Sequence, residues 1–172
     1  MQLRPATDAD VPAIVALANL AYRAVGPGAG WNSEGEIIGG QRTDEVTLRA
    51  DLAASPDALL LLHEEEGEIL ASVWLEPLEA GAWYLGLLTV RPDLQDRKLG
   101  RGLLAAAEET AKARGATRIC MSVVNVRDTL IAWYERRGYG LTGETQPFPY
   151  GDERFGLPLR DDLHFVVLEK PL

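Results

Sequence analysis

The stretch VRPDLQDRKLGRG, from Val90 to Gly102, is an informative part of the sequence. It follows an apolar run and precedes a segment of helical periodicity, so it predicts a strand, a loop and the start of a helix. Arginine and lysine gather in it, although the chain carries a net charge of -9. Because Gly100 and Gly102 leave the first amides of the helix uncovered, the stretch predicts a pyrophosphate site. A solvated basic helix start is the alternative.

Two other phosphate-binding motifs are excluded by the same stretch. The P-loop pattern GxxxxGK[ST] does not occur in the chain. The dinucleotide pattern GxGxxG is also absent, because Gly102 is followed by Leu103, Leu104 and Ala105. The net negative charge argues against a nucleic-acid partner and weakly favours a cationic one, such as an amine.

Length and composition predict one domain over residues 1–172. Hydrophobic residues make up 47% of the chain, enough for a full core. The N-terminus lacks a signal-peptide core, and apolar runs such as Ala58–Leu62 are too short to span a membrane. The single cysteine, Cys120, excludes an internal disulfide. We therefore expect a cytoplasmic protein without membrane contact.

Hydrophobic periodicity outlines a mixed sheet with helices on both faces. We expect Thr43 to cap the second helix, and Lys98 to take helical backbone angles. The glycine-rich loop Val25–Gly40 is a poor helix or strand. Strands are expected near Leu3 and at 58–63, 69–76, 82–90, 118–124, 140–145 and 163–169, and helices at about 10–23, 43–54, 98–114 and 129–137.

Three motifs, in order and at the expected spacing, resemble the GCN5-related N-acetyltransferase (GNAT) family. LLTVRP at Leu87–Pro92 is similar to the end of its fourth strand, QDRKLGRG at Gln95–Gly102 to its pyrophosphate loop, and DTLIAWYERRGY at Asp128–Tyr139 to its late helix. The resemblance covers nearly the whole chain. It implies an α/β fold with a mostly antiparallel sheet of six or seven strands, splayed between the fourth and fifth, and about four helices.

The resemblance also implies acetyl-CoA as cosubstrate, an amine as acceptor, and a set of cofactor contacts. The pantetheine arm would pair with the backbone of Leu88, Thr89 and Val90 as an extra strand would. The pyrophosphate would lie over amides between Asp96 and Gly102. The residues implied in this loop are Gln95, Asp96, Arg97, Lys98, Leu99, Gly100, Arg101 and Gly102.

Two positions depart from the family pattern. Counted from Pro92, the first glycine of the pyrophosphate loop is replaced by Lys98, whereas counting from Arg97 gives an intact R-x-x-G-x-G. The asparagine often found seven residues before the helix tyrosine is Arg127 here, and Asn125 lies two residues earlier. Either Asn125 or Arg127 could contact the cofactor.

The chemistry of acetyl transfer needs a proton donor for the leaving thiol and loss of a proton from the amine. By the resemblance, Tyr134 faces the cofactor sulfur as the acid, and the Val90 amide donates to the acetyl oxygen. A tyrosine packed on the helix face is the alternative for Tyr134. In many relatives a glutamate on the fourth strand acts as the general base, but the corresponding strand here, AWYLGLLTV, has no carboxylate. Glu76, His164 and a water path are the alternatives for the base.

Two loops that contain both aromatic and charged residues are candidates for binding the acceptor, a small molecule or a peptide. They are GWNSEGE at Gly30–Glu36 and the aromatic and charged segment Pro147–Phe165. Loops of this kind are usually functional or disordered, and aromatic residues argue against disorder. The proposed acceptor residues are Trp31, Glu34, Tyr150 and Asp152, with loop packing as the alternative. The late loop could also form a homodimer contact, and no metal site is expected.

Three functions remain open from the sequence. The first is an N-acetyltransferase that moves the acetyl group directly within a ternary complex. The second is a non-catalytic module that binds CoA or acyl-CoA as a regulator, since the strand carboxylate is missing. The third is a different nucleotide-dependent enzyme, which would prefer NAD or ATP to CoA.

Overall fold

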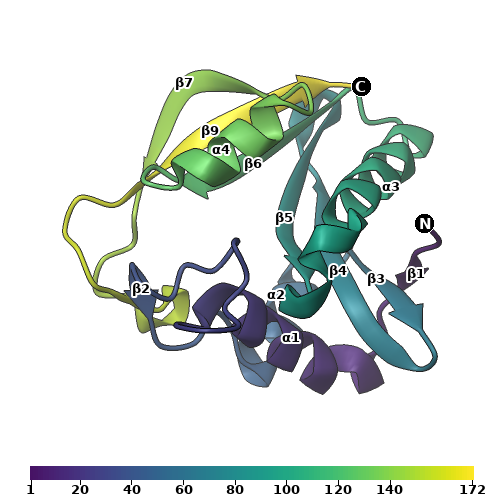
Figure 1. The fold of residues 1–172 in the computed structure, drawn as a ribbon. Helices are drawn as coiled ribbons and strands as arrows, with labels where there is room; N and C mark the ends of the chain where they lie inside the picture. The colour runs from purple at the N-terminus through teal and green to yellow at the C-terminus, as the bar shows by residue number, and fades with distance from the viewer.

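The protein is built around a seven-stranded sheet with α-helices on both faces (Figure 1). The computed structural model describes residues 1–172 apart from the side chain of Asp96. The sheet order is β1-β3-β4-β5-β6-β9-β7, and every neighbouring pair is antiparallel except β5 and β6. The strands are β1 (Arg4–Pro5), β3 (Leu59–Glu65), β4 (Glu68–Pro77), β5 (Ala82–Val90), β6 (Arg118–Val124), β7 (Gly140–Pro147) and β9 (His164–Pro171). This mixed, mostly antiparallel sheet confirms the predicted fold class.

Two helices cover each face of the sheet. The helices are α1 (Val11–Arg23), α2 (Glu45–Ala54), α3 (Leu99–Ala113) and α4 (Asp128–Glu135). On one face, Ile14 of α1 and Leu48 of α2 pack against β3 and β4. On the other, Leu103 of α3 and Leu130 of α4 belong to a larger core over β4, β5 and β6. Each such buried side chain contributes about 1.5–3 kcal/mol through the hydrophobic effect.

The starts of the first two helices follow from local chemistry. Pro12 occupies the first turn of α1, where its missing N–H costs no hydrogen bond. The side chain of Asp44, not that of Thr43, caps α2 by accepting a hydrogen bond from the Thr47 amide at 2.7 Å. The expected Thr43 cap is therefore wrong by one residue: Thr43 is buried just before the cap.

A small second sheet was not foreseen in the glycine-rich loop. Ile38–Gly39 forms β2, which pairs antiparallel with Leu157–Pro158, the strand β8. Ile38 is buried, and it packs with Phe148 and Leu163. The loop is thus tied to the late segment, and the prediction that it forms no strand is corrected there.

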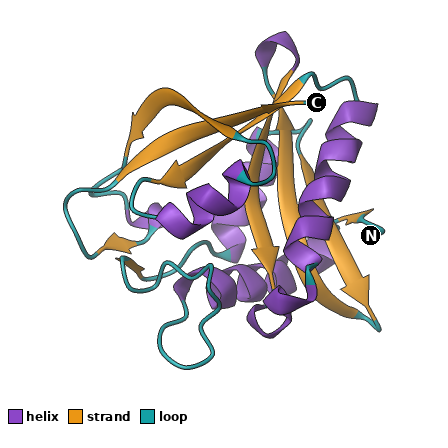
Figure 2. Cartoon of the chain, turned by 45° about the horizontal axis from the view of Figure 1, so that its top comes forward, coloured by secondary structure: helices purple, strands orange, loops and turns teal.

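The strand β5 separates from its parallel neighbour after a short contact. It pairs with β6 from Ala82–Arg118 to Tyr84–Cys120, near the C-terminus, and the two strands then diverge (Figure 2). Near the middle of β5, a register shift opposite β4 accompanies a positive φ of 47° at Leu87. The backbone of β5 beyond Tyr84 is therefore free of a β6 partner, as the predicted splay requires.

The turn into α3 also differs from expectation at one residue. Lys98 has φ 62° and ψ 12°, in the left-handed region, and not right-handed helical angles. A side chain is disfavoured there relative to glycine because Cβ crowds the backbone. This is the position at which the family pattern counted from Pro92 places a glycine, so the local fold keeps the glycine-like turn with a lysine in it.

Candidate active site

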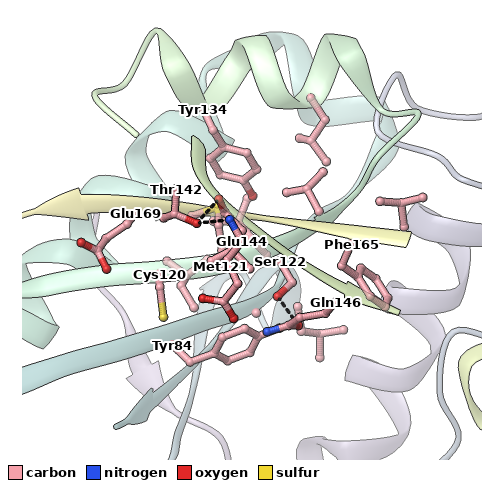
Figure 3. Close-up of a pocket in the computed structure, with 18 of the residues that line it drawn as sticks. Tyr84, Cys120, Met121, Ser122, Tyr134, Thr142, Glu144, Gln146, Phe165 and Glu169 are labelled. Carbon is pink, nitrogen blue, oxygen red and sulfur yellow. Dashed lines mark hydrogen bonds between the residues drawn. The ribbon is translucent and has the colours of Figure 1, made fainter. Parts of the chain in front are cut away.

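The diverging strands leave a large cleft on the face of β6, β9 and β7 that is turned toward α1. Its volume is about 770 Å³. Tyr84 and Gly86 of β5 form one wall, the segment from Tyr22 to Arg42 forms another, and Tyr134 enters from α4. Figure 3 shows Tyr84 and Tyr134 together with polar residues of the cleft. The polar floor of the cleft comprises Cys120, Ser122, Thr142, Glu144, Gln146 and Glu169.

A smaller cavity of about 350 Å³ lies at the start of α3. Leu88 and Leu130 line both cavities, so the two spaces adjoin beside the unpaired part of β5. The described side chains of the smaller cavity include three cations and no carboxylate. Its further lining residues are Trp31, Asn32, Val90, Gln95, Lys98, Gly100, Arg101, Trp133 and Arg137.

The helix start supplies hydrogen-bond donors to this cationic cavity. The amide of Gly102 donates to the Lys98 carbonyl at 3.1 Å, so the amides before it have no partner within the helix. A Cβ on Gly100 would come within 3.7 Å of Trp133, whereas one on Gly102 would face Met1. Free amides, the helix dipole and cationic side chains together fit a pyrophosphate.

The predicted cofactor residues divide between this cavity and its surroundings. Six of them line it: Leu88, Val90, Gln95, Lys98, Gly100 and Arg101. Thr89 is fully buried, and its hydroxyl donates to the Leu87 carbonyl at 2.9 Å. Arg97, Leu99 and Gly102 belong to the same turn but not to the lining. The side chain of Asp96 lies outside the described residues.

The side chains of Asn125 and Arg127 are engaged elsewhere. Arg127 pairs with Glu34 at 3.0 Å and donates to the side-chain oxygen of Asn32 at 2.9 Å. Asn125 accepts from the His164 amide at 2.9 Å and donates to the Asp162 carbonyl at 3.1 Å. Both therefore hold loops in place, and a cofactor contact by either stays a prediction.

Tyr134 lines the larger cleft, and its ring is packed against two aromatic neighbours. Its ring packs edge-on against Trp133 at 5.0 Å and against Tyr139 at 5.6 Å, and it extends from α4 into the cleft (Figure 3). Burial raises the pKa of Tyr134 well above its ordinary value of 10, and the nearby Tyr22 and Tyr84 act in the same direction. The phenol is therefore protonated at neutral pH and able to donate.

Neither residue proposed as the base lines the cleft. Glu76 accepts hydrogen bonds from the Ser55 hydroxyl at 2.7 Å and the Trp74 indole at 3.2 Å. In β9, Phe165, Val167 and Glu169 line the cleft, and side chains alternate along a strand. His164 therefore points to the opposite face.

The cleft contains carboxylates that sequence reasoning missed. Glu169 pairs with Arg118 at 3.1 Å, whereas Glu144 forms no ion pair with a described residue. Glu144 and Gln146 of β7 share a face because they are two residues apart. That alternation was visible in GLTGETQP, but only the fold shows that this face borders the cleft.

The predicted acceptor residues are spread over three places. Trp31 packs on Trp133 at 6.0 Å in the smaller cavity. Glu34 is on the wall of the cleft, clamped between Arg127 and Arg23, the latter at 2.8 Å. Tyr150 donates to the Arg160 carbonyl and accepts from the Leu163 amide, and Asp152 pairs with Arg154. Neither Tyr150 nor Asp152 lines the two cavities described here.

Tyr22 and Arg42 line the cleft without having been singled out in the sequence. The Tyr22 hydroxyl donates to the Leu88 carbonyl at 2.9 Å, and burial raises its pKa to about 12. The Arg42 guanidinium lies over the Tyr22 ring, 5.3 Å from the centroid. Their separation of twenty residues across a loop gives no periodic signal, which is why sequence reasoning missed both.

The comparison with protein families identifies the chain. A model described as the acetyltransferase (GNAT) family matches residues 19–139, and the chain belongs to that family. This confirms the resemblance drawn from the three motifs, and the family is one of acetyltransferases. Among the described residues, no helix is long and apolar enough to cross a membrane, and no group of three potential metal ligands occurs.

Two curated relatives match parts of the chain. Mycothiol acetyltransferase of Beutenbergia cavernae is 35% identical over 85 residues, which are 49% of this chain and 29% of that protein. Acetyltransferase ECA0875 of Pectobacterium atrosepticum is 33% identical over 97 residues, which are 55% of this chain and 66% of that protein. The chain thus spans less than two thirds of each relative's length.

Solved structures share the fold over the full length. The ribosomal-protein-alanine N-acetyltransferase from Brucella melitensis superposes with a TM-score of 0.72 at 22% identity, covering 100% of both chains. An N-acetyltransferase called paia from Thermoplasma acidophilum, solved in complex with coenzyme A, has a TM-score of 0.68 at 16% identity and covers 99% of this chain and 98% of its own. At these identities the likeness shows the fold alone.

Proposed function

We propose that this chain transfers an acetyl group from acetyl-CoA directly to a primary amine in a ternary complex. The observation that carries the proposal is the junction of two cavities at Leu88. A cationic cavity with free helix amides lies on one side, and a cleft open to an acceptor lies on the other. Family membership and the solved relative with bound coenzyme A support the choice of cofactor.

The residues at the start of α3 fit a pyrophosphate. Lys98 and Arg101 would attract it, and the free amides of the helix start would bind it. The backbone of Leu88 and Val90, which has no β6 partner, would accept an extended arm. When bound, acetyl-CoA supplies an acetyl thioester, whose carbonyl carbon is open to attack by an amine.

The chain's own groups would then serve the transfer at this junction. The Val90 amide would donate to the acetyl oxygen as it gains negative charge, and Tyr134 would protonate the leaving sulfur. A free amine would attack, and the proton it loses would pass to water in the cleft or to Glu144, which forms no ion pair with a described residue; water would then return a proton to Tyr134. Glu76 and His164 remain alternatives that would require water to reach them.

Calorimetric titration of the purified protein with acetyl-CoA, CoA, NAD and ATP tests the cofactor. We expect micromolar binding that is selective for the CoA species. A screen of amines with thiol release as the signal then tests turnover. Binding without turnover of any amine would favour the regulatory module. A preference for NAD or ATP would select another enzyme, and no CoA binding by cofactor-free protein would overturn the proposal.

A further inference from the structure

Arg42 is an unpaired cation in the wall of the larger cleft. The cleft is lined by three arginines, of which Arg23 pairs with Glu34 and Arg118 pairs with Glu169. The guanidinium of Arg42 makes no hydrogen bond or ion pair with any described side chain or carbonyl. Its five donors are therefore open to a ligand.

The position of Arg42 is fixed even though its head group is free. Its backbone amide donates to the side-chain oxygen of Asn19 at 2.6 Å, and the Asn19 amide group donates to the Thr43 carbonyl at 2.9 Å. The guanidinium lies over the ring of Tyr22, whose hydroxyl contacts the Leu88 carbonyl. Arg42 is thus two contacts away from the strand segment where the two cavities meet.

The charges around Arg42 favour an acceptor of mixed charge. Burial raises the pKa of Asp51 in α2, and the positive charge of Arg42 opposes this rise. The two residues nevertheless form no ion pair. Glu144 lines the cleft from β7, also without an ion pair to a described residue. Arg42 and two carboxylates without an ion pair to a described residue, Glu79 and Glu144, therefore line the same space, which complements a molecule with an ammonium and an anionic group.

We propose that the acceptor is a small amino-carboxylate, such as an amino acid, and that Arg42 binds its carboxylate. An arginine fork matches the two oxygens of a carboxylate, so the contact fixes orientation as well as charge. Ile38 and the rings of Phe148, Phe155 and Phe165 also line the cleft and offer apolar surface to a side chain. The inference rests on the proposed acetyl transfer and specifies its acceptor.

The test compares L-methionine and L-phenylalanine with their primary amides, which lack only the negative charge. At saturating acetyl-CoA, kcat/KM is expressed per unprotonated amine. We expect the acids to be preferred at least tenfold. Arg42→Gln should reduce the preference to about twofold or less, Arg42→Lys should keep part of it, and Arg49→Gln, an exposed arginine that pairs with Asp8 and Glu45, should change nothing.

Equal use of acids and amides by the unaltered protein would overturn the inference while leaving acetyl transfer intact. So would an Arg42→Gln variant that slows both classes equally. If no acceptor is turned over, ligand-observed NMR titration of L-phenylalanine and L-phenylalaninamide, with and without CoA, decides: selective binding of the acid that Arg42→Gln abolishes supports the inference, and equal or absent binding refutes it. Calorimetry with CoA reports separately on the proposed function.

Discussion

At the scale of single residues, Tyr134 is the group whose removal best separates binding from chemistry. Its phenol is buried among aromatic rings, faces the cleft, and has a raised pKa. We expect Tyr134→Phe to lower kcat about 100-fold, because a general acid typically contributes 10²–10⁴-fold. Cofactor affinity, measured by calorimetry, should stay within twofold.

A matched tyrosine on the same side of the molecule provides the control. The Tyr139 hydroxyl donates to Glu108 at 2.9 Å, and Tyr139 does not line the cleft. Tyr139→Phe should therefore lower the free energy of unfolding by about 1 kcal/mol with no loss of kcat. Equal loss of kcat in both variants would argue that Tyr134 acts through packing only.

Lys98 makes a second prediction at this scale, concerning stability. The left-handed backbone at Lys98 costs a residue with a side chain about 1–2 kcal/mol. Glycine avoids this cost, but it also raises the conformational entropy of the unfolded chain, which offsets part of the gain in stability. We expect Lys98→Gly to raise the free energy of unfolding by roughly 0.5–1 kcal/mol in urea titrations. Lys112→Gly, in the last turn of α3, removes the same charge but should destabilise by a similar amount. Destabilisation in both variants would contradict the strain argument.

At the scale of elements, the segment between α1 and α2 is held by a buried cluster of charges. Glu34 lies between Arg23 and Arg127, and the three side chains are only 12%, 7% and 10% exposed. Removing the carboxylate would leave two buried cations facing each other. We expect Glu34→Gln to lower the free energy of unfolding by about 3 kcal/mol, as for other broken buried pairs.

Urea unfolding of Glu34→Gln should be compared with Glu36→Gln. Glu36 is exposed in the same loop, so its substitution should change stability by less than about 0.5 kcal/mol. Because Arg127 also binds Asn32, next to Trp31, the Glu34 variant should weaken CoA binding as well. A Glu34 variant as stable as the Glu36 variant would show that the cluster is dispensable.

The elements themselves were largely predictable because each has a strong local signal. The bounds of β5 and β6 follow directly from apolar runs flanked by turns, and both agree with the structure. The pair β2–β8 was not predictable, because two residues give no periodicity and their pairing joins segments about 120 residues apart. The prediction of right-handed helical angles for Lys98 was wrong for a related reason. The turn imposes left-handed angles on this residue, against the preference of a residue with a side chain.

At the scale of the whole molecule, the carboxylates predict loss of stability in acid. Hydrogen bonds from Arg4 and from the Thr7 amide lower the pKa of Asp10 from its ordinary value of 3.8. Hydrogen bonds to other carboxylates act in the same direction, while burial raises the pKa of Asp51. The other lowered carboxylates are Asp44, Asp93, Asp152 and Asp162.

A lowered pKa stabilises the fold above the ordinary pKa, and this stabilisation is lost as the pH falls toward the native value. The free energy of unfolding should therefore decrease below about pH 4. Urea titrations between pH 2.5 and 7 should show that the free energy of unfolding of Asp10→Asn is lower at neutral pH than that of the unaltered protein. It should also decrease less as the pH falls. Asp57→Asn, at an exposed site, should keep the unaltered pH dependence. If Asp10→Asn lost as much stability in acid as the unaltered protein, Asp10 would not be a source of the pH dependence.

The candidate site was predictable where it is contiguous in sequence and not where it is assembled by the sheet. The stretch from Gln95 to Gly102 contributes four lining residues to the smaller cavity because a loop and a helix start are local. The cleft instead gathers Arg42, Tyr84 and Glu144, which no spacing rule connects. For His164, alternation along β9 could have been applied, but only the pairing with β6 shows which face borders the cleft.

The short contact between β5 and β6 has a consequence for how the nascent chain assembles on the ribosome. Residues 1–113 contain β1, β3, β4 and β5 with three helices, so these strands can complete their pairing before β6 is synthesised. The second half cannot assemble stepwise, because β9, the last strand made, lies between β6 and β7. A nascent chain that stopped before His164 would leave β6 and β7 without their common neighbour, and the floor of the cleft could not assemble.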